Sequence, residues 1–177
     1  SDSENEEESA YLSLNFCLGK TLDKELIEAF DIIDYALCSA PGAPLKQALT
    51  DRKVGKEVYS MLETSMMQPM FSIVAKDASL EKQPLFMETI ERVLNEIVKN
   101  GFDKKALKAA INYYEFKYRE ADFGSYPKGL MYGLKTFDSW LYDEKAPFMY
   151  LQANEVYEFL KEKAEENYFE ELVQRYL

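Results

Sequence analysis

The stretch FKYREADFGSYPKGLMYGL, residues 116–134, joins the end of one predicted helix to the start of the next. A helix capped by Asp103 is expected to run to about Ala121, and a second one from Lys128 to Tyr142. The segment between them contains residues that interrupt helices: Gly124, Pro127 and Gly129. These residues predict a tight turn between two helices.

A second stretch, DYALCSAPGAPLKQAL at residues 34–49, has the same construction. It begins within a predicted helix from Leu22 to about Ala40, for which Thr21 is the expected N-cap. The Pro-Gly-x-Pro sequence at 41–44 then ends that helix. A short helix from Pro44 to about Arg52 follows, because proline suits a first helical turn.

Strands are expected near the N-terminus and again in the first half of the chain. Apolar and polar residues alternate from Tyr11 to Leu18, which is typical of a half-buried strand. Two further strands are predicted, Val58–Met67 and Met70–Ala75. Gln68-Pro69 marks the turn between them, since proline cannot donate to a β-ladder.

Helices are expected to dominate the remainder. Ser79 is placed to cap a helix to Lys99, and Asn154 to cap a last helical region to Leu177, which is two helices if its pattern breaks near Ala164. Four helices carry apolar stripes at i, i+4, i+7 and i+11; that of the 128–142 helix is Leu130, Leu134, Phe137 and Leu141. One-faced packing onto a sheet produces this pattern. The sequence therefore predicts an α+β fold, a small antiparallel-rich sheet with several helices packed on one face.

Composition divides the chain into two parts. Residues 1–9 are polar and acidic, and are expected to form a disordered lead-in. Residues 10–177 are expected to be a single αβ domain, with 153–177 as an alternative helical appendage. With 47% hydrophobic residues, this domain can bury a core without a metal or disulfide.

The net charge of −11 argues against nucleic acid and against an anionic membrane surface as partners. A basic peptide partner is compatible with it, and so is a charge that serves solubility alone. No apolar run reaches the about 20 residues that a membrane span needs. The cysteines, Cys17 and Cys38, are expected to be buried reduced thiols, which favours the cytoplasm or another reducing compartment.

No chemistry of the common kinds is predicted for this chain. It contains no histidine, so no serine or cysteine has a histidine base, and no imidazole can bind a metal. Asp31 and Asp34 lie three residues apart on a predicted helix, and such pairs are usually solvated helix faces. We therefore predict no catalytic residue and no metal site.

The two quoted stretches, together with the order of elements from about Tyr11 onward, resemble the pitrilysin/insulysin zinc metallopeptidases, most closely their presequence-protease branch. Peptidases of that family bind zinc through H-x-x-E-H, which this chain lacks. The resemblance thus implies a second, non-catalytic domain. Zinc would belong to the catalytic domain of the parent protein, and this chain would need no cofactor.

The resemblance also implies a function and partners. The parent would be a zinc metalloendopeptidase that degrades unfolded peptides in a closed chamber, and this domain would form chamber wall and support the zinc domain. Its partners would be sister domains of the same chain and a peptide substrate, with basic peptides favoured by the acidic wall. The alternative is a stand-alone or catalytically dead interaction scaffold of the same fold.

Two groups of site residues follow. By resemblance, Val58, Tyr59, Ser60 and Met61 form a strand edge that holds substrate; the alternative is an ordinary core strand. From spacing, Glu115 and Arg119 are expected to form an ion pair at the structural corner that also includes Gly124, Pro127 and Gly129, with Arg119, Glu120 and Asp122 in a buried cluster beside it. Off-stripe tyrosines are expected at an interface or a peptide-binding wall: Tyr113, Tyr126, Tyr132 and Tyr142.

Overall fold

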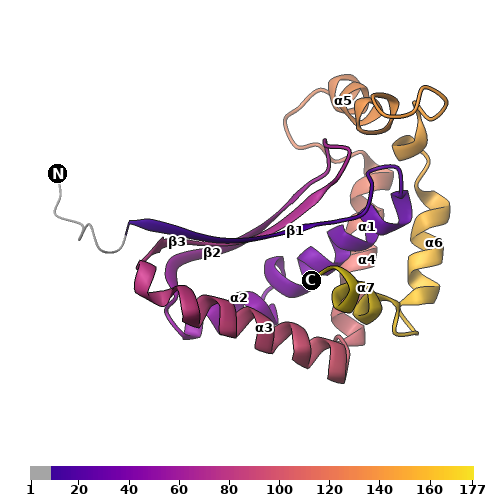
Figure 1. Ribbon diagram of the computed structural model, residues 1–177. Coiled ribbons are helices and arrows are strands. Elements are labelled where there is room, and N and C mark those ends of the chain that lie inside the picture. Colours follow the sequence, from indigo (N-terminus) through magenta and orange to yellow (C-terminus); the bar gives the residue numbers. More distant parts are fainter. Residues whose placement is uncertain (1–8) are drawn as a thin grey trace.

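The structure, a computed structural model, describes residues 9–177. Three antiparallel strands form one sheet in the order β1-β3-β2: β1 (Ala10–Cys17), β2 (Gly55–Glu63) and β3 (Met70–Ala78). Figure 1 shows several helices gathered beneath one face of this sheet. The predicted α+β fold with a small antiparallel sheet is therefore confirmed. The predicted lead-in, except for Ser9, lies outside the described residues.

The core lies between the sheet and the helices beneath it. Alternate strand residues face the helices, because side chains point to opposite faces along a strand. The inward-facing residues of the central strand β3 are Phe71, Ile73 and Ala75, each 0% exposed. Phe30 of the first helix packs against Phe71, with ring centres 6.1 Å apart. In β1, Leu12 is buried and Leu14 and Phe16 are half-buried, while the residues between them are exposed, so the period of two identified the buried face of this strand correctly.

The first helix, α1 (Lys24–Asp34), continues as a π-helical turn, η2 (Tyr35–Ser39). The expected Thr21 cap is wrong, because the Asp23 carboxylate accepts the hydrogen bond from the Leu26 amide at 3.1 Å. Thr21 is instead fully buried, and its hydroxyl lies 3.1 Å from the Thr64 carbonyl oxygen and 3.2 Å from that of Asp138. It joins the start of the helix to the β2–β3 hairpin.

The middle helices follow the sequence signals closely. They are α2 (Pro44–Asp51), α3 (Gln83–Asn100) and α4 (Lys104–Glu120). Ser79 caps a short 3₁₀ turn, η3 (Leu80–Lys82), that leads into α3, which ends at Gly101 with φ of 82°. Asp103 caps α4 through a 2.8 Å hydrogen bond from the Lys105 amide, as predicted.

The C-terminal part forms a 3₁₀ turn and two helices: η4 (Met149–Leu151), α6 (Asn154–Lys163) and α7 (Tyr168–Tyr176). The break near Ala164 is thus confirmed. The Asn154 cap is wrong, since Ala153 occupies the N-cap position and no side chain caps the helix. Phe169 of α7 is 0% exposed and belongs to the same core as the sheet.

Helix α5 (Lys128–Trp140) departs from the prediction. Its expected apolar stripe does not pack on the sheet; Leu134 is 52% exposed and Leu141, just after the helix, is 67% exposed. The reason is its position, because α5 stands beyond the tip of the β2–β3 hairpin and not beneath the sheet (Figure 1). Polar contacts hold it there, including a 2.9 Å hydrogen bond from the Tyr142 hydroxyl to the Ser65 carbonyl.

Candidate functional site

The predicted strand edge lies on an outer strand of the sheet. β2 pairs with β3 only, and within residues 9–177 no strand pairs with its other side. Backbone groups of alternate residues on an outer strand point away from the sheet, where they can bind another extended chain. An edge strand of this kind can take up a peptide as an added strand.

The side chains of residues 58–61 divide between two faces. Val58 is 4% exposed and points into the core, and Ser60 lies on the same face because strand side chains alternate. Tyr59 and Met61 lie on the other face of the sheet, where Met61 is 50% exposed. The strand is thus anchored by one face and presents a second face, with an apolar and adaptable side chain, to solvent.

Beneath β2 lies a small group of buried polar atoms. Burial raises the pKa of the Asp34 carboxyl, while the Ser60 and Ser39 hydroxyls offset part of that rise. Burial likewise raises the pKa of the Cys38 thiol to about 12. Cys38 is therefore an inert thiol in the core. Cys17, in contrast, is exposed on β1, which corrects the expectation that both cysteines are buried.

The predicted ion pair is present within α4, but it belongs to a network that reaches α6 and not the turn before α5. Glu115 is 8% exposed, and its Oε1 lies 2.5 Å from Arg119 Nη2. Its Oε2 lies 2.8 Å from Lys161 Nζ, and Lys161 also pairs with Glu158 at 3.0 Å. The network therefore ties α4 to α6, away from the turn that follows α4.

The turn itself is stabilised by other contacts. Gly124 adopts a left-handed φ of 59°, and its amide donates to Asp122 Oδ1 at 3.2 Å. The Phe123 ring meets that of Tyr132 edge to face at 5.3 Å, which holds the turn against α5. Pro127 precedes the first residue of α5, and Gly129 lies in its first turn. Arg119, Glu120 and Asp122 are all exposed, so the buried cluster expected there does not form.

An extensive exposed apolar surface surrounds α5. Aromatic and aliphatic side chains between 39% and 67% exposed belong to this surface: Tyr126, Leu130, Tyr132, Leu134, Phe137, Trp140 and Leu141. Soluble proteins seldom leave so many large apolar side chains together without a partner. The off-stripe tyrosines do not act alike, since Tyr126 and Tyr132 belong to this surface, Tyr142 bonds the hairpin, and Tyr113 stacks on Tyr35 at 5.0 Å.

The sequence interpretation treated the α1 carboxylates as solvated, and the structure corrects this. Burial, followed by the nearby Glu28 charge, raises the pKa of Asp31 to about 8. Glu28, which was not singled out, is 4% exposed and accepts a 2.8 Å hydrogen bond from the Tyr157 hydroxyl. The sequence carried no clear signal for this burial, because charged residues alternate with apolar ones along the helix as they do on a solvated amphipathic helix.

Within residues 9–177 no three His, Cys, Asp or Glu side chains are grouped so that they could hold a metal ion. Among the helices of that same region, none has the length and apolar character needed to cross a bilayer. The features of the described residues with groups free to contact another molecule are the outer edge of β2, the exposed apolar surface around α5 and the carboxylates of α1.

Comparison with known proteins shows the family and the fold. Residues 2–114 match the family model described as the Peptidase M16 inactive domain. The chain is 42% identical over 176 residues to Protein HypA of Clostridium perfringens, and 32% identical over 157 residues to Presequence protease 1 of Arabidopsis thaliana. These matches cover 99% and 88% of this chain, and 18% and 14% of the relatives. The chain thus spans less than a fifth of their length.

Solved structures agree with this at the level of the fold. The inactive peptidase domain of a zinc protease from Bordetella parapertussis superposes with a TM-score of 0.66 at 10% identity, covering 96% of this chain and 84% of that chain. A protease from Helicobacter pylori gives a TM-score of 0.59 at 17% identity, covering 94% of this chain and 38% of that one. In the second case the shared fold is one part of a larger chain.

Proposed function

The chain belongs to the inactive-domain family of the M16 peptidases, and on that premise we propose that it serves as the non-catalytic domain of a zinc-dependent metalloendopeptidase. The parent protein would degrade unfolded peptides. This domain would form part of the wall around the substrate and would support the domain that carries the zinc. The relatives' much greater length supports this proposal, because it leaves room for sister domains.

The observation that carries the proposal is the absence of histidine from all 177 residues. Zinc peptidases of this kind hold the metal with two imidazoles on one helix, and a catalytic zinc site needs three protein ligands. The residues present do not fit that metal. We therefore assign no step of hydrolysis to this chain, and we place the zinc in another domain of the parent.

The contribution of the chain would be to hold substrate. An extended peptide can add to the outer edge of β2 at Val58, Tyr59, Ser60 and Met61. Backbone hydrogen bonds are independent of side-chain identity, so such binding suits an enzyme that accepts many unfolded sequences. The net charge of −11 would favour basic peptides among them.

The apolar surface around α5 would contact a sister domain. Its side chains are too exposed to stabilise the isolated chain, and burying them against a neighbour would contribute about 25 cal/mol per Å² of apolar surface. Because α5 is held to the hairpin tip by the Tyr142–Ser65 hydrogen bond, that contact would also orient the edge of β2.

Peptide hydrolysis by two proteins tests the proposal: the isolated chain, and the product of the full reading frame that contains it. We expect the full product to cleave an unfolded peptide and a chelator to stop it, while the isolated chain stays inert with added zinc. A full product that lacks a zinc motif and cleaves nothing would instead support an interaction scaffold.

Hydrogen exchange tests the role of the strand edge. A full product made inactive at its zinc site should protect alternate amides of residues 58–61 when an unfolded peptide binds. The matched control is β1, the other outer strand of the same sheet, which should exchange unchanged. Equal protection of both strands, or protection of neither, would contradict the assignment of the edge.

A further inference from the structure

A cavity of about 290 Å³ lies between α1, α4, α5 and the residues around η4. Five tyrosines contribute to its walls, and Glu28 and Asp31 of α1 also line it. We call this cavity the tyrosine pocket. Sites that hold a whole small ligand usually measure about 300–1,000 Å³, so the tyrosine pocket has the size for one long side chain.

The two carboxylates that α1 contributes to the pocket, beside exposed Asp122 at its rim, are unequally satisfied. Glu28 is 4% exposed and is held by Tyr157, whose hydroxyl donates to Oε2 at 2.8 Å. Asp31, one turn further along α1, receives no hydrogen bond or ion pair from the part of the chain that the structure describes. Asp31 is half-buried, and a carboxylate that loses part of its water without gaining a partner costs folding free energy, which a bound cation would offset.

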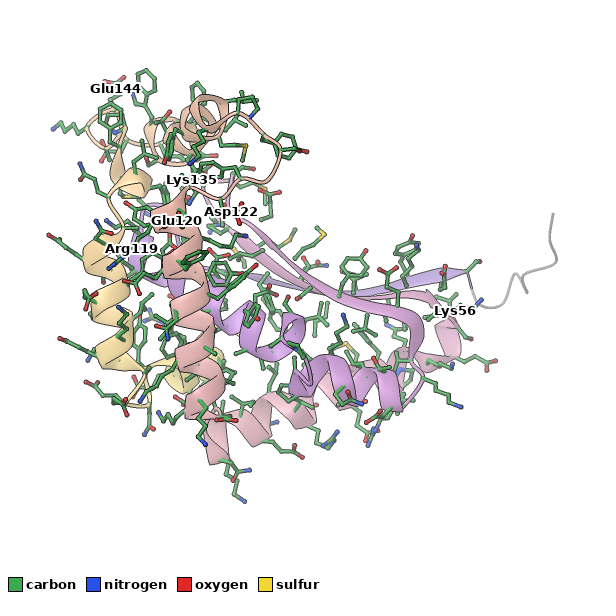
Figure 2. All side chains as sticks on the ribbon, turned by 180° about the vertical axis from the view of Figure 1, so that it is seen from behind. Lys56, Arg119, Glu120, Asp122, Lys135 and Glu144 are labelled. Atoms are coloured by element: carbon green, nitrogen blue, oxygen red, sulfur yellow. The ribbon has the colours of Figure 1, made fainter. Side chains whose placement is uncertain are left out.

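Two lysines also line the pocket and partly offset its negative charge, but neither forms an ion pair with its carboxylates. Neither Lys117 nor Lys135 comes within 4 Å of a carboxylate oxygen among the described residues, and the Lys117 ammonium lies over the Tyr113 ring, 5.4 Å from its centre. The two lysine side chains are half-buried, whereas the Glu28 side chain is buried. In Figure 2 the labelled Lys135 and Asp122 lie where α5 stands over the end of α4.

The pocket is close to the strand edge through α1. Asp34, one turn after Asp31, lies against Ser60 of β2, and that serine hydroxyl lowers the pKa of Asp34. One helical turn rises about 5.4 Å, so the Asp31 position and the middle of β2 are near neighbours. A side chain that leaves a strand bound at this edge can therefore approach the pocket.

We propose that the tyrosine pocket binds an arginine side chain of a peptide held along β2, with the guanidinium between the tyrosine rings and the Asp31 carboxylate. This inference deepens the proposed function and rests on it. Arginine suits the site better than lysine, because its planar, weakly hydrated cation stacks on aromatic rings and pairs with carboxylates through two hydrogen bonds. The pocket would thus favour peptides that carry an arginine at one position, while the outer edge of β2 would bind the peptide backbone whatever the other residues are.

The charge state of Asp31 changes when the pocket is filled. The charged groups that act on it are Glu28, Asp34, Lys117 and Lys135. Burial favours its neutral form in the empty pocket, whereas a guanidinium favours the carboxylate. Binding of arginine is therefore accompanied by release of a proton from Asp31 near neutral pH.

The test uses the full reading-frame product, made inactive at its zinc site, and fluorescein-labelled decapeptides read by anisotropy. One peptide carries a single arginine, and its partners carry lysine or the neutral isostere citrulline at that position. We expect the arginine peptide to bind about tenfold more tightly than the citrulline peptide, as one charge-assisted hydrogen-bonded contact allows. Lysine should fall between them.

Two variants connect the effect to the pocket. Asp31→Asn should remove the difference between arginine and citrulline, and Lys135→Met should increase it. The control, Glu91→Gln on the exposed face of α3, should leave it unchanged. Equal binding of all three peptides, or a preference that survives Asp31→Asn, would overturn the arginine pocket alone. If none of the peptides binds, the proposed substrate-holding function fails as well.

Discussion

Replacing Asp31 with asparagine is expected to stabilise the isolated chain at neutral pH. Burial, then repulsion by Glu28, raises the pKa of Asp31 from 3.8 to about 8. A carboxyl group whose pKa is higher in the folded chain binds its proton more tightly there than in the unfolded chain. The folded state is therefore favoured by protonation, and its stability falls as pH rises from about 4 to about 8. Asparagine carries no proton to lose and removes this dependence.

The magnitude follows from the size of the shift. Each pH unit within that window changes the free energy of unfolding by at most about 1.4 kcal/mol per proton. The Asp31 side chain borders a cavity that water can enter, and Lys117 and Lys135 partly compensate its charge. We therefore expect about half the full slope. The stability advantage of Asp31→Asn over the wild type should then grow by about 2 kcal/mol between pH 5 and pH 8.

Urea unfolding followed by circular dichroism at pH 5, 6, 7 and 8 measures this difference. The slope of free energy against urea should be the same for both proteins, so that the midpoint alone reports stability. Glu91→Gln, an exposed carboxylate on α3, is the matched control and should run parallel to the wild type. Parallel curves for Asp31→Asn and the wild type would refute the reasoning, because Asp31 would then be as solvated in the folded chain as in the unfolded one.

Three further predictions concern the packing of the helices. Lys161→Met should lower the melting temperature by about 2–4 °C in calorimetry, because the Lys161 ammonium ties Glu115 of α4 to α6. Lys105→Met, at an exposed lysine of α4, is the control and should leave the melting temperature unchanged. Gly124→Ala should lower the free energy of unfolding in urea by about 1 kcal/mol, because residue 124 has a left-handed φ of 59°. Gly129→Ala is the control, since a methyl group there meets open space within α5, and it should be neutral or stabilising. Equal losses of stability for the two variants would contradict this. An exposed apolar surface of this extent should make the isolated chain self-associate. Leu134→Glu, at a side chain 52% exposed on that surface, should weaken this association in sedimentation velocity and leave the melting temperature unchanged; a destabilised monomer would be evidence against that surface.

Local patterns predicted the parts of the fold that local forces determine. The alternation in β1 identified its buried face, and Asp103 marked a helix start, because a cap depends on neighbouring backbone groups. Thr21 shows where this reasoning stops. Its hydroxyl bonds carbonyl groups 43 and 117 residues away, so a cap signal in sequence was outweighed by tertiary contacts.

The candidate site was less predictable than the fold. The stripe on α5 has the same spacing as a core-facing stripe, and only its place beyond the hairpin tip leaves it exposed. Periodicity shows that a face is apolar and does not say which partner covers it. The Asp31 carboxylate was treated as solvated for a related reason, since its burial depends on α4 and α5 folding over α1.

Hydrolysis of an unfolded peptide by the full reading-frame product, before and after deletion of residues 9–177, tests the central claim most directly. The account predicts that deletion abolishes hydrolysis while the remaining protein still binds zinc, and that adding the isolated chain restores part of the activity. Undiminished hydrolysis after deletion, or hydrolysis by the isolated chain alone, would contradict the claim that this chain is a required, non-catalytic domain.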